Sequence, residues 1–169
     1  VPALSRWRQL EGEIVEAVSV PRPTAAFTAR DAAAVWARAF NSRSSTVLTK
    51  WLAHDLRYVS EWAEREIDNP NDYLEHLEAR LKTIRDSAIE ARAELAEMAP
   101  FPGSLAEPQP CVMVDLDGKP LATVLFQVDG RNITKIEFSM NPAPDACVRT
   151  GIFPGLDVFK NALQATFWH

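Results

Sequence analysis

The sequence predicts an α+β domain, and two kinds of pattern support this fold class. In the first half of the chain, apolar residues recur at the helical spacing i, i+3, i+4, as at Ala32, Val35 and Trp36. In the second half, the Asp-Gly pairs at 117–118 and 129–130 each separate two apolar runs. This is the strongest short-range signal for a β-hairpin. Helices are therefore expected mainly in the first half, and an antiparallel meander of three strands in the second.

Composition indicates one domain with extensions. The 169 residues are 47% hydrophobic, which excludes global disorder and leaves room for a core with a pocket. The longest apolar runs, such as residues 121–126, fall far short of the roughly 20 residues of a membrane helix, and no signal peptide opens the chain. The net charge of −5, with scattered basic residues, argues against nucleic-acid binding. We therefore expect a cytoplasmic protein that contacts neither membranes nor nucleic acids.

Three helical segments are predicted before the first strand. Residues 3–19 form an amphipathic helix that ends at a proline-containing linker. Thr28 and Asp31 resemble a capping box, which indicates that a second helix begins there. A short third helix over residues 47–52 then leads into the first strand, residues 55–62.

That first strand carries the most informative pattern in the chain. Tyr58, Ser60 and Trp62 alternate with other residues and therefore share one face, whereas Arg57 and Glu61 lie on the other. Two aromatic rings that flank a hydroxyl are typical of the wall of a half-polar cavity. The alternative is that the rings fill an ordinary core, with their polar ends bonded to the backbone.

The next two elements are a helix and a strand. Asn69 can cap the helix, Pro70 suits its first position, and the apolar stripe continues to about Asp86. Residues 88–98 alternate as in a strand, although the same residue types are good helix formers. We favour the strand, because one helix of about 30 residues would be unusual here.

A proline-rich loop at 100–110 precedes the meander. Its strands are predicted at roughly 111–116, 121–128 and 132–140. Residues 142–169 form a C-terminal extension with a short helix.

The order of these elements, with Phe40-Asn41 and the segments 54–58 and 130–136, resembles the nuclear transport factor 2-like (SnoaL-like) superfamily over residues 28–141. The resemblance implies helices packed on the concave face of a strongly curved antiparallel sheet, forming a cone with a pocket at its open end. The superfamily includes ketosteroid isomerase, scytalone dehydratase, limonene epoxide hydrolase, polyketide cyclases and many binding modules without activity. The helix and linker of residues 1–27 and the extension of residues 142–169 lie outside the resemblance.

The pocket that the resemblance implies has six candidate ligand-binding residues. They are Trp36, Phe40, Tyr58, Ser60, Trp62 and Gln127. The rings of the second helix would form an aromatic ceiling over the pocket, although core packing explains them as well.

Tyr58 and Glu137 are the candidate catalytic residues. Enzymes of the superfamily use tyrosines and carboxylates inside the cone, where a phenol donates to a developing oxyanion and a buried carboxylate moves a proton. Glu137, with Gln127 on the neighbouring strand, can serve as the base only if its face of the last strand points inward. Ile136 and Phe138 compete for that side.

Metal and cofactor chemistry is not expected. His54, His76 and His169 are widely spaced, His76 is expected to be solvated, and the chain contains no paired ligand motif. Cys111 and Cys147 are expected to be free thiols rather than a disulfide, because a domain of this size does not need one.

Three functions remain open. The first is a protein that binds a small apolar or amphipathic molecule in an aromatic-lined pocket. The second is a metal-free isomerase, dehydratase or cyclase, and the third is an interaction module with a filled cone. A homodimer through the sheet is expected because one face of the strand at 121–128 is wholly apolar, although the terminal extensions could cover it instead.

Overall fold

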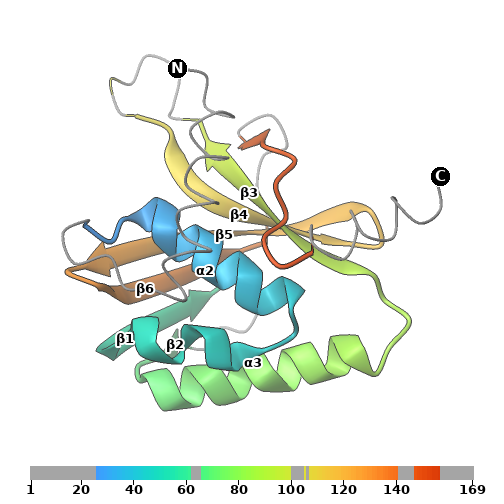
Figure 1. Ribbon diagram of the computed structural model, residues 1–169, viewed down its shortest axis with the longest axis horizontal. Helices are drawn as coiled ribbons and strands as arrows, with labels where there is room; N and C mark the ends of the chain where they lie inside the picture. The colour runs from blue at the N-terminus through green and yellow to red at the C-terminus, as the bar shows by residue number, and fades with distance from the viewer. Residues whose placement is uncertain (1–25, 62–65, 100–104, 106, 141–146, 157–169) are drawn as a thin grey trace.

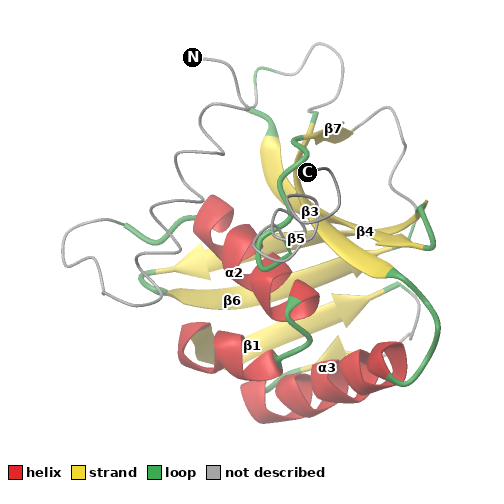
Figure 2. Ribbon diagram, turned by 45° about the vertical axis from the view of Figure 1, so that its right-hand side comes forward, coloured by secondary structure: helices red, strands yellow, loops and turns green. Residues whose placement is uncertain are grey.

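The computed structural model has helices on one face of a seven-stranded sheet (Figures 1 and 2). It describes residues 26–61, 66–99, 105, 107–140 and 147–156. The sheet is curved and the helices lie on its inner face, so the predicted α+β class is confirmed. The helices predicted near the two ends of the chain, and the outer domain boundaries, lie outside the described residues.

Helix α2 (Ala29–Asn41) begins where the sequence predicts. The Thr28 side chain accepts a hydrogen bond from the Asp31 N–H, and the Asp31 carboxylate accepts one from the Thr28 N–H at 2.7 Å. Both bonds satisfy donors that the first turn leaves without partners. The capping box is therefore confirmed, and it fixes the start of the helix that carries Trp36 and Phe40.

The next segment is a 3-10 helix, η1 (Ser45–Trp51), which leads directly into strand β1 (Leu52–Ser60). The strand begins three residues earlier than predicted. It pairs with the short strand β2 (Glu66–Ile67), which the sequence analysis did not predict.

Helix α3 (Pro70–Arg85) and strand β3 (Ala91–Met98) agree with the prediction. The Asn69 side chain accepts a hydrogen bond from the Asp72 N–H at 2.8 Å, and Pro70 occupies the first turn. The ambiguous segment after this helix is thus a strand. Helix α3 packs on β1 and η1, whereas α2 crosses β3, β4 and β5.

The meander consists of β4 (Gln109–Leu116), β5 (Lys119–Asp129) and β6 (Asn132–Ser139). Asp117 and Gly118 both have positive φ, as a tight hairpin turn with the favoured twist requires. The second turn lies one residue later than predicted, at Gly130-Arg131, because Asp129 still pairs with Asn132.

The sheet order is β2-β1-β6-β5-β4-β3-β7, with β7 (Cys147–Arg149) at one edge. Every pair is antiparallel except β1 and β6, which run parallel, so the sheet is not purely antiparallel as predicted. A parallel pair needs a long connection between its strands, and here the chain between β1 and β6 contains β2, α3, β3, β4 and β5. Helix α3 is thereby brought back against β1.

The main core lies between the inner face of the sheet and α2. Asn41, at the end of α2, joins these layers: its side-chain amide donates to the carbonyls of Ala93 and Pro154 and accepts from the Ala93 N–H, each at 2.8 Å. Asn41 is only 5% exposed, so these bonds form out of water. They hold α2 at a fixed position over β3.

Candidate functional site

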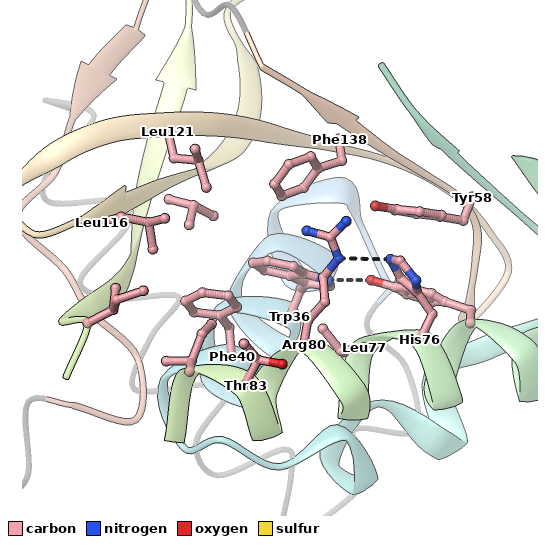
Figure 3. A pocket seen from close by; sticks show the side chains of 14 residues that line it. Trp36, Phe40, Tyr58, His76, Leu77, Arg80, Thr83, Leu116, Leu121 and Phe138 are labelled. Atoms are coloured by element: carbon pink, nitrogen blue, oxygen red, sulfur yellow. Dashed lines mark hydrogen bonds between the residues drawn. The ribbon is translucent and has the colours of Figure 1, made fainter. Parts of the chain in front are cut away.

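A cavity of about 230 Å³ lies between α3, α2 and the inner face of the sheet (Figure 3). Its wall is made mainly of aromatic and aliphatic side chains from both halves of the chain. The lining residues are Trp36, Phe40, Tyr58, Tyr73, His76, Leu77, Arg80, Thr83, Ile84, Ile89, Val114, Leu116, Leu121 and Phe138.

Trp36 is the central residue of the aromatic wall. Its ring stacks on Phe40 with centroids 5.2 Å apart, and it contacts Phe126 on β5 at 6.2 Å. The indole N–H donates a hydrogen bond of 2.8 Å to the hydroxyl of Tyr73 on α3. This bond connects the two helices across the base of the cavity and fixes the plane of the indole ring.

Two tyrosines and a histidine meet beside β1. The Tyr58 ring lies 4.9 Å from the Tyr73 ring and 5.3 Å from the His76 ring, measured between centroids. Burial raises the pKa of Tyr58, and a hydrogen bond from Ser60 and the charge of Arg80 offset only part of that rise. Burial likewise raises the pKa of Tyr73. Both phenols therefore remain protonated at neutral pH.

Arg80 supplies the charge of the site. Its side chain extends from α3 into the cavity, and its Nε donates to Nε2 of His76 at 3.2 Å (Figure 3). Because Nε2 of His76 accepts this bond, the proton of the neutral imidazole lies on Nδ1. The two side chains are one helical turn apart and face the same way.

Leu121 reaches the cavity because of an irregularity in β5. Val114 pairs with Ala122 but Asp115 pairs with Pro120, so Leu121 is an extra residue in the ladder. A bulge of this kind bends the strand and redirects a side chain. Leu121 therefore packs against the inner core, as Ala122 does, although strict alternation would place it with Thr123 on the outer face.

Three of the six predicted ligand-binding residues line the cavity: Trp36, Phe40 and Tyr58. Ser60 is buried beside Tyr58 but does not line the cavity wall. The strand has the predicted orientation, since Arg57 and Glu61 are exposed. Trp62 lies outside the described residues.

The structure places Gln127 and Glu137 elsewhere. Ile136 and Phe138 are buried on the inner side of β6, so Glu137 between them points to the outer face. There it lines a separate small depression with Gln127 and Lys135. The expected pair of Tyr58 and Glu137 in one pocket is therefore wrong, because strand alternation puts the two side chains on opposite faces of the sheet.

Helix α3 contributes to the cavity, and this contribution was not predicted from the sequence. His76, expected to be solvated, is half-buried and lines the cavity with buried Tyr73 and with Arg80 and Thr83, which are also exposed to solvent. The signal was present in the sequence, because positions 73, 76, 77, 80 and 84 have the spacing of one helical face. The polar residues of that face were assigned to solvent, since a helix next to a half-polar cavity has the same pattern as a helix at the surface.

The described residues contain no group of three or more His, Cys, Asp or Glu side chains that could hold a metal ion. Within the same residues, no helix is long and apolar enough to cross a membrane.

No protein-family model matches the chain, and no curated protein matches it. Similar solved structures include an NTF2-like protein of unknown function from Cytophaga hutchinsonii, at 17% identity and a TM-score of 0.47 over 72% of this chain and 96% of that one. A protein from Kribbella flavida has 14% identity and a TM-score of 0.49, over 84% and 98% of the two chains. An LEH-like epoxide hydrolase from M. tuberculosis has 12% identity and a TM-score of 0.42, over 65% and 84%. At these identities and TM-scores the likeness concerns the fold alone, and it carries no information about activity.

Proposed function

We propose that this protein binds a small, largely apolar molecule in the cavity between α3 and the sheet. The observation that carries the proposal is the composition of the wall: aromatic and aliphatic side chains surround a few polar groups, as in most small-molecule sites. At about 230 Å³, the cavity is smaller than the roughly 300–1,000 Å³ of sites for drug-sized ligands. The ligand should be correspondingly small.

The other two functions have less support. An interaction module with a filled cone does not need a cavity of this size. An enzyme that uses Tyr58 and Glu137 lacks its base, because the described residues that line the cavity include no carboxylate. The cavity therefore favours binding over acid–base catalysis by this pair.

The size of the cavity also limits the affinity. A ligand that buries about 200 Å² of apolar surface gains on the order of 5 kcal/mol at about 25 cal/mol per Å². A gain of about 5 kcal/mol corresponds to a dissociation constant of about 0.2 mM. Association costs reduce this gain, so dissociation constants of about 0.2 mM or weaker are expected. A search for ligands must therefore extend to millimolar concentrations.

The test is a thermal-shift screen of small aromatic and alicyclic compounds at millimolar concentration, since a ligand that binds only the native state raises its apparent stability. Leu121→Trp fills the cavity, and Leu125→Trp is its control: both leucines are half-buried on β5, but Leu125 lines the outer depression. Compounds that stabilise the wild-type protein should fail with Leu121→Trp and still bind Leu125→Trp. Hits that bind both variants equally, or a screen without any apolar hit, would contradict the proposal.

The homodimer through the sheet and the cytoplasmic location remain predictions. The wholly apolar face of the strand at 121–128, on which the expected homodimer rests, lies in the inner core under the helices and needs no second copy. A second copy would instead cover the small apolar cluster on the outer face, where half-buried Met98, Leu125 and Cys147 surround Cys111 and Met113. A stable symmetric interface should bury on the order of 1,200 Å² or more in total.

A further inference from the structure

The cavity has a polar end and an apolar end. Tyr58, His76 and Arg80 gather near β1, whereas Leu116 and Leu121 lie towards the β4–β5 hairpin (Figure 3). The polar cluster is compact, because the Tyr58 and His76 rings are 5.3 Å apart and Arg80 is bonded to His76. A ligand that matches both ends must itself be amphipathic.

The polar end presents hydrogen-bond donors. Tyr73 accepts a bond from Trp36 and keeps its own proton to donate, and Tyr58 shares a bond with Ser60 in which either hydroxyl can be the donor. Arg80 carries five N–H groups, of which Nε bonds to His76. Because a guanidinium is cationic and no carboxylate lines the described wall, this end of the cavity is positive.

Acceptors with negative charge are missing from the same wall. The lining residues that the structure describes include neither Asp nor Glu. The Thr83 hydroxyl already donates to the carbonyl of Ala79 at 3.0 Å. Arg80 and Thr83 are exposed and His76 is half-buried, so this end lies at the open side of the cavity. A cationic group placed here would meet the charge of Arg80 with no carboxylate in the described wall to offset it, whereas an anion would gain both an opposite charge and donors.

We infer that the ligand is a small amphipathic carboxylate, held with its carboxyl group at Arg80 and Tyr58 and its apolar part between Phe40, Leu116 and Leu121. This inference rests on the proposed function and adds the chemical class of the ligand. A carboxylate matches the planar fork of a guanidinium with two parallel hydrogen bonds, and it is among the smallest organic anions, as the cavity requires.

The test compares 3-phenylpropanoate with 3-phenylpropanamide, which have nearly the same shape but differ in charge, and adds 3-phenylpropylamine as the cation. Isothermal titration at constant ionic strength should give the carboxylate an affinity about tenfold or more above that of the amide. The amine should bind more weakly than the amide.

Arg80→Met should remove this preference: the carboxylate loses about tenfold in affinity or more, and the amide changes by less than about twofold. Arg85→Met is the matched control, because Arg85 lies on the same helix but bonds to Glu78 and to the carbonyl of Arg43. It should leave all three affinities unchanged. Arg80→Lys keeps the charge without the fork and should give an intermediate loss, which provides a second measurement if Arg80→Met does not fold.

The outcomes separate the inference from the function on which it rests. If the amide or the amine binds as tightly as the carboxylate, or if Arg80→Met weakens all ligands equally, the carboxylate inference is wrong while the binding function stands. The same conclusion follows if every compound that Leu121→Trp blocks is neutral. If no compound of any class depends on the cavity, both proposals fail.

Discussion

The two faces of the sheet are built from the same strands and differ in chemistry. The inner face is apolar and covered by helices, and it contains a cavity with a few polar groups at one end. The outer face combines a small apolar cluster with charged side chains that bond to one another. The charged side chains of the strands therefore bond to one another and stabilise the sheet. The polar side chains of the cavity come mainly from helix α3.

Arg149 organises the charged part of the outer face. Its guanidinium donates to both carboxylate oxygens of Asp115, at 2.7 and 2.8 Å, and to Glu94 at 3.0 Å. The bonds to Asp115 raise the pKa of Arg149. Glu94 also accepts a bond of 2.8 Å from the Gly151 N–H, so this network attaches β7 and the following loop to β3 and β4. Its polar groups are satisfied within the protein, which argues against a ligand site there.

The largest expected effect on stability concerns the hydrogen bonds of Asn41, which connect α2 to the inner face of the sheet. Asn41→Ala removes three hydrogen bonds and leaves polar groups of Ala93 and Pro154 buried without partners. At about 1–3 kcal/mol for each unsatisfied group, the free energy of unfolding should fall by about 3 kcal/mol or more. Urea denaturation followed by circular dichroism measures this change.

Gln127→Ala is the control for that experiment, because Gln127 is an exposed amide on the outer face. Its removal should change the free energy of unfolding by less than about 0.5 kcal/mol. Equal losses in the two variants would mean that the buried amide of Asn41 does not connect the layers.

A smaller effect is expected at the base of the cavity. Tyr73→Phe leaves the Trp36 indole N–H buried without its acceptor and should cost about 1–3 kcal/mol. Tyr58→Phe should cost less, because the Ser60 hydroxyl that it leaves can rotate and can act as donor or acceptor, whereas the indole N–H of Trp36 is fixed and can only donate. Thermal and urea unfolding of both variants give the comparison. A larger loss for Tyr58→Phe would place the structural hydrogen bond at β1 instead of between the helices.

Features that depend on a few neighbouring residues could be predicted from the sequence. The capping box at Thr28 and Asp31, the cap at Asn69 and the turn at Asp117-Gly118 each rely on bonds or dihedral angles within four residues. The orientation of Tyr58 could also be predicted, because side chains alternate regularly between the two faces along the end of β1.

Features that depend on distant partners could not be predicted. The bulge at Leu121 arises from the way β4 and β5 pair, and its local signal is only the neighbouring Pro120, a residue that also fits the start of a strand. Strand alternation alone also left the face of Glu137 undecided, since both sides of β6 contain apolar residues. The polar side of α3 was assigned to water because a sequence does not reveal that a helix borders a cavity.

The smallest effect is expected at Glu137, and it separates the two faces most directly. Glu137→Gln removes one charge from the outer depression, where Lys135 and Gln127 are its neighbours, and keeps the shape of the side chain. A partly exposed charge of this kind contributes about 0–1 kcal/mol, so the unfolding midpoint should barely move. Because the side chain points away from Tyr58, the affinity for compounds that bind in the cavity should change by less than about twofold. Titration of such a compound against the wild type, Glu137→Gln and Arg80→Met measures this. A tenfold loss with Glu137→Gln, equal to that of Arg80→Met, would mean that the outer face takes part in binding and that the division between the two faces is wrong.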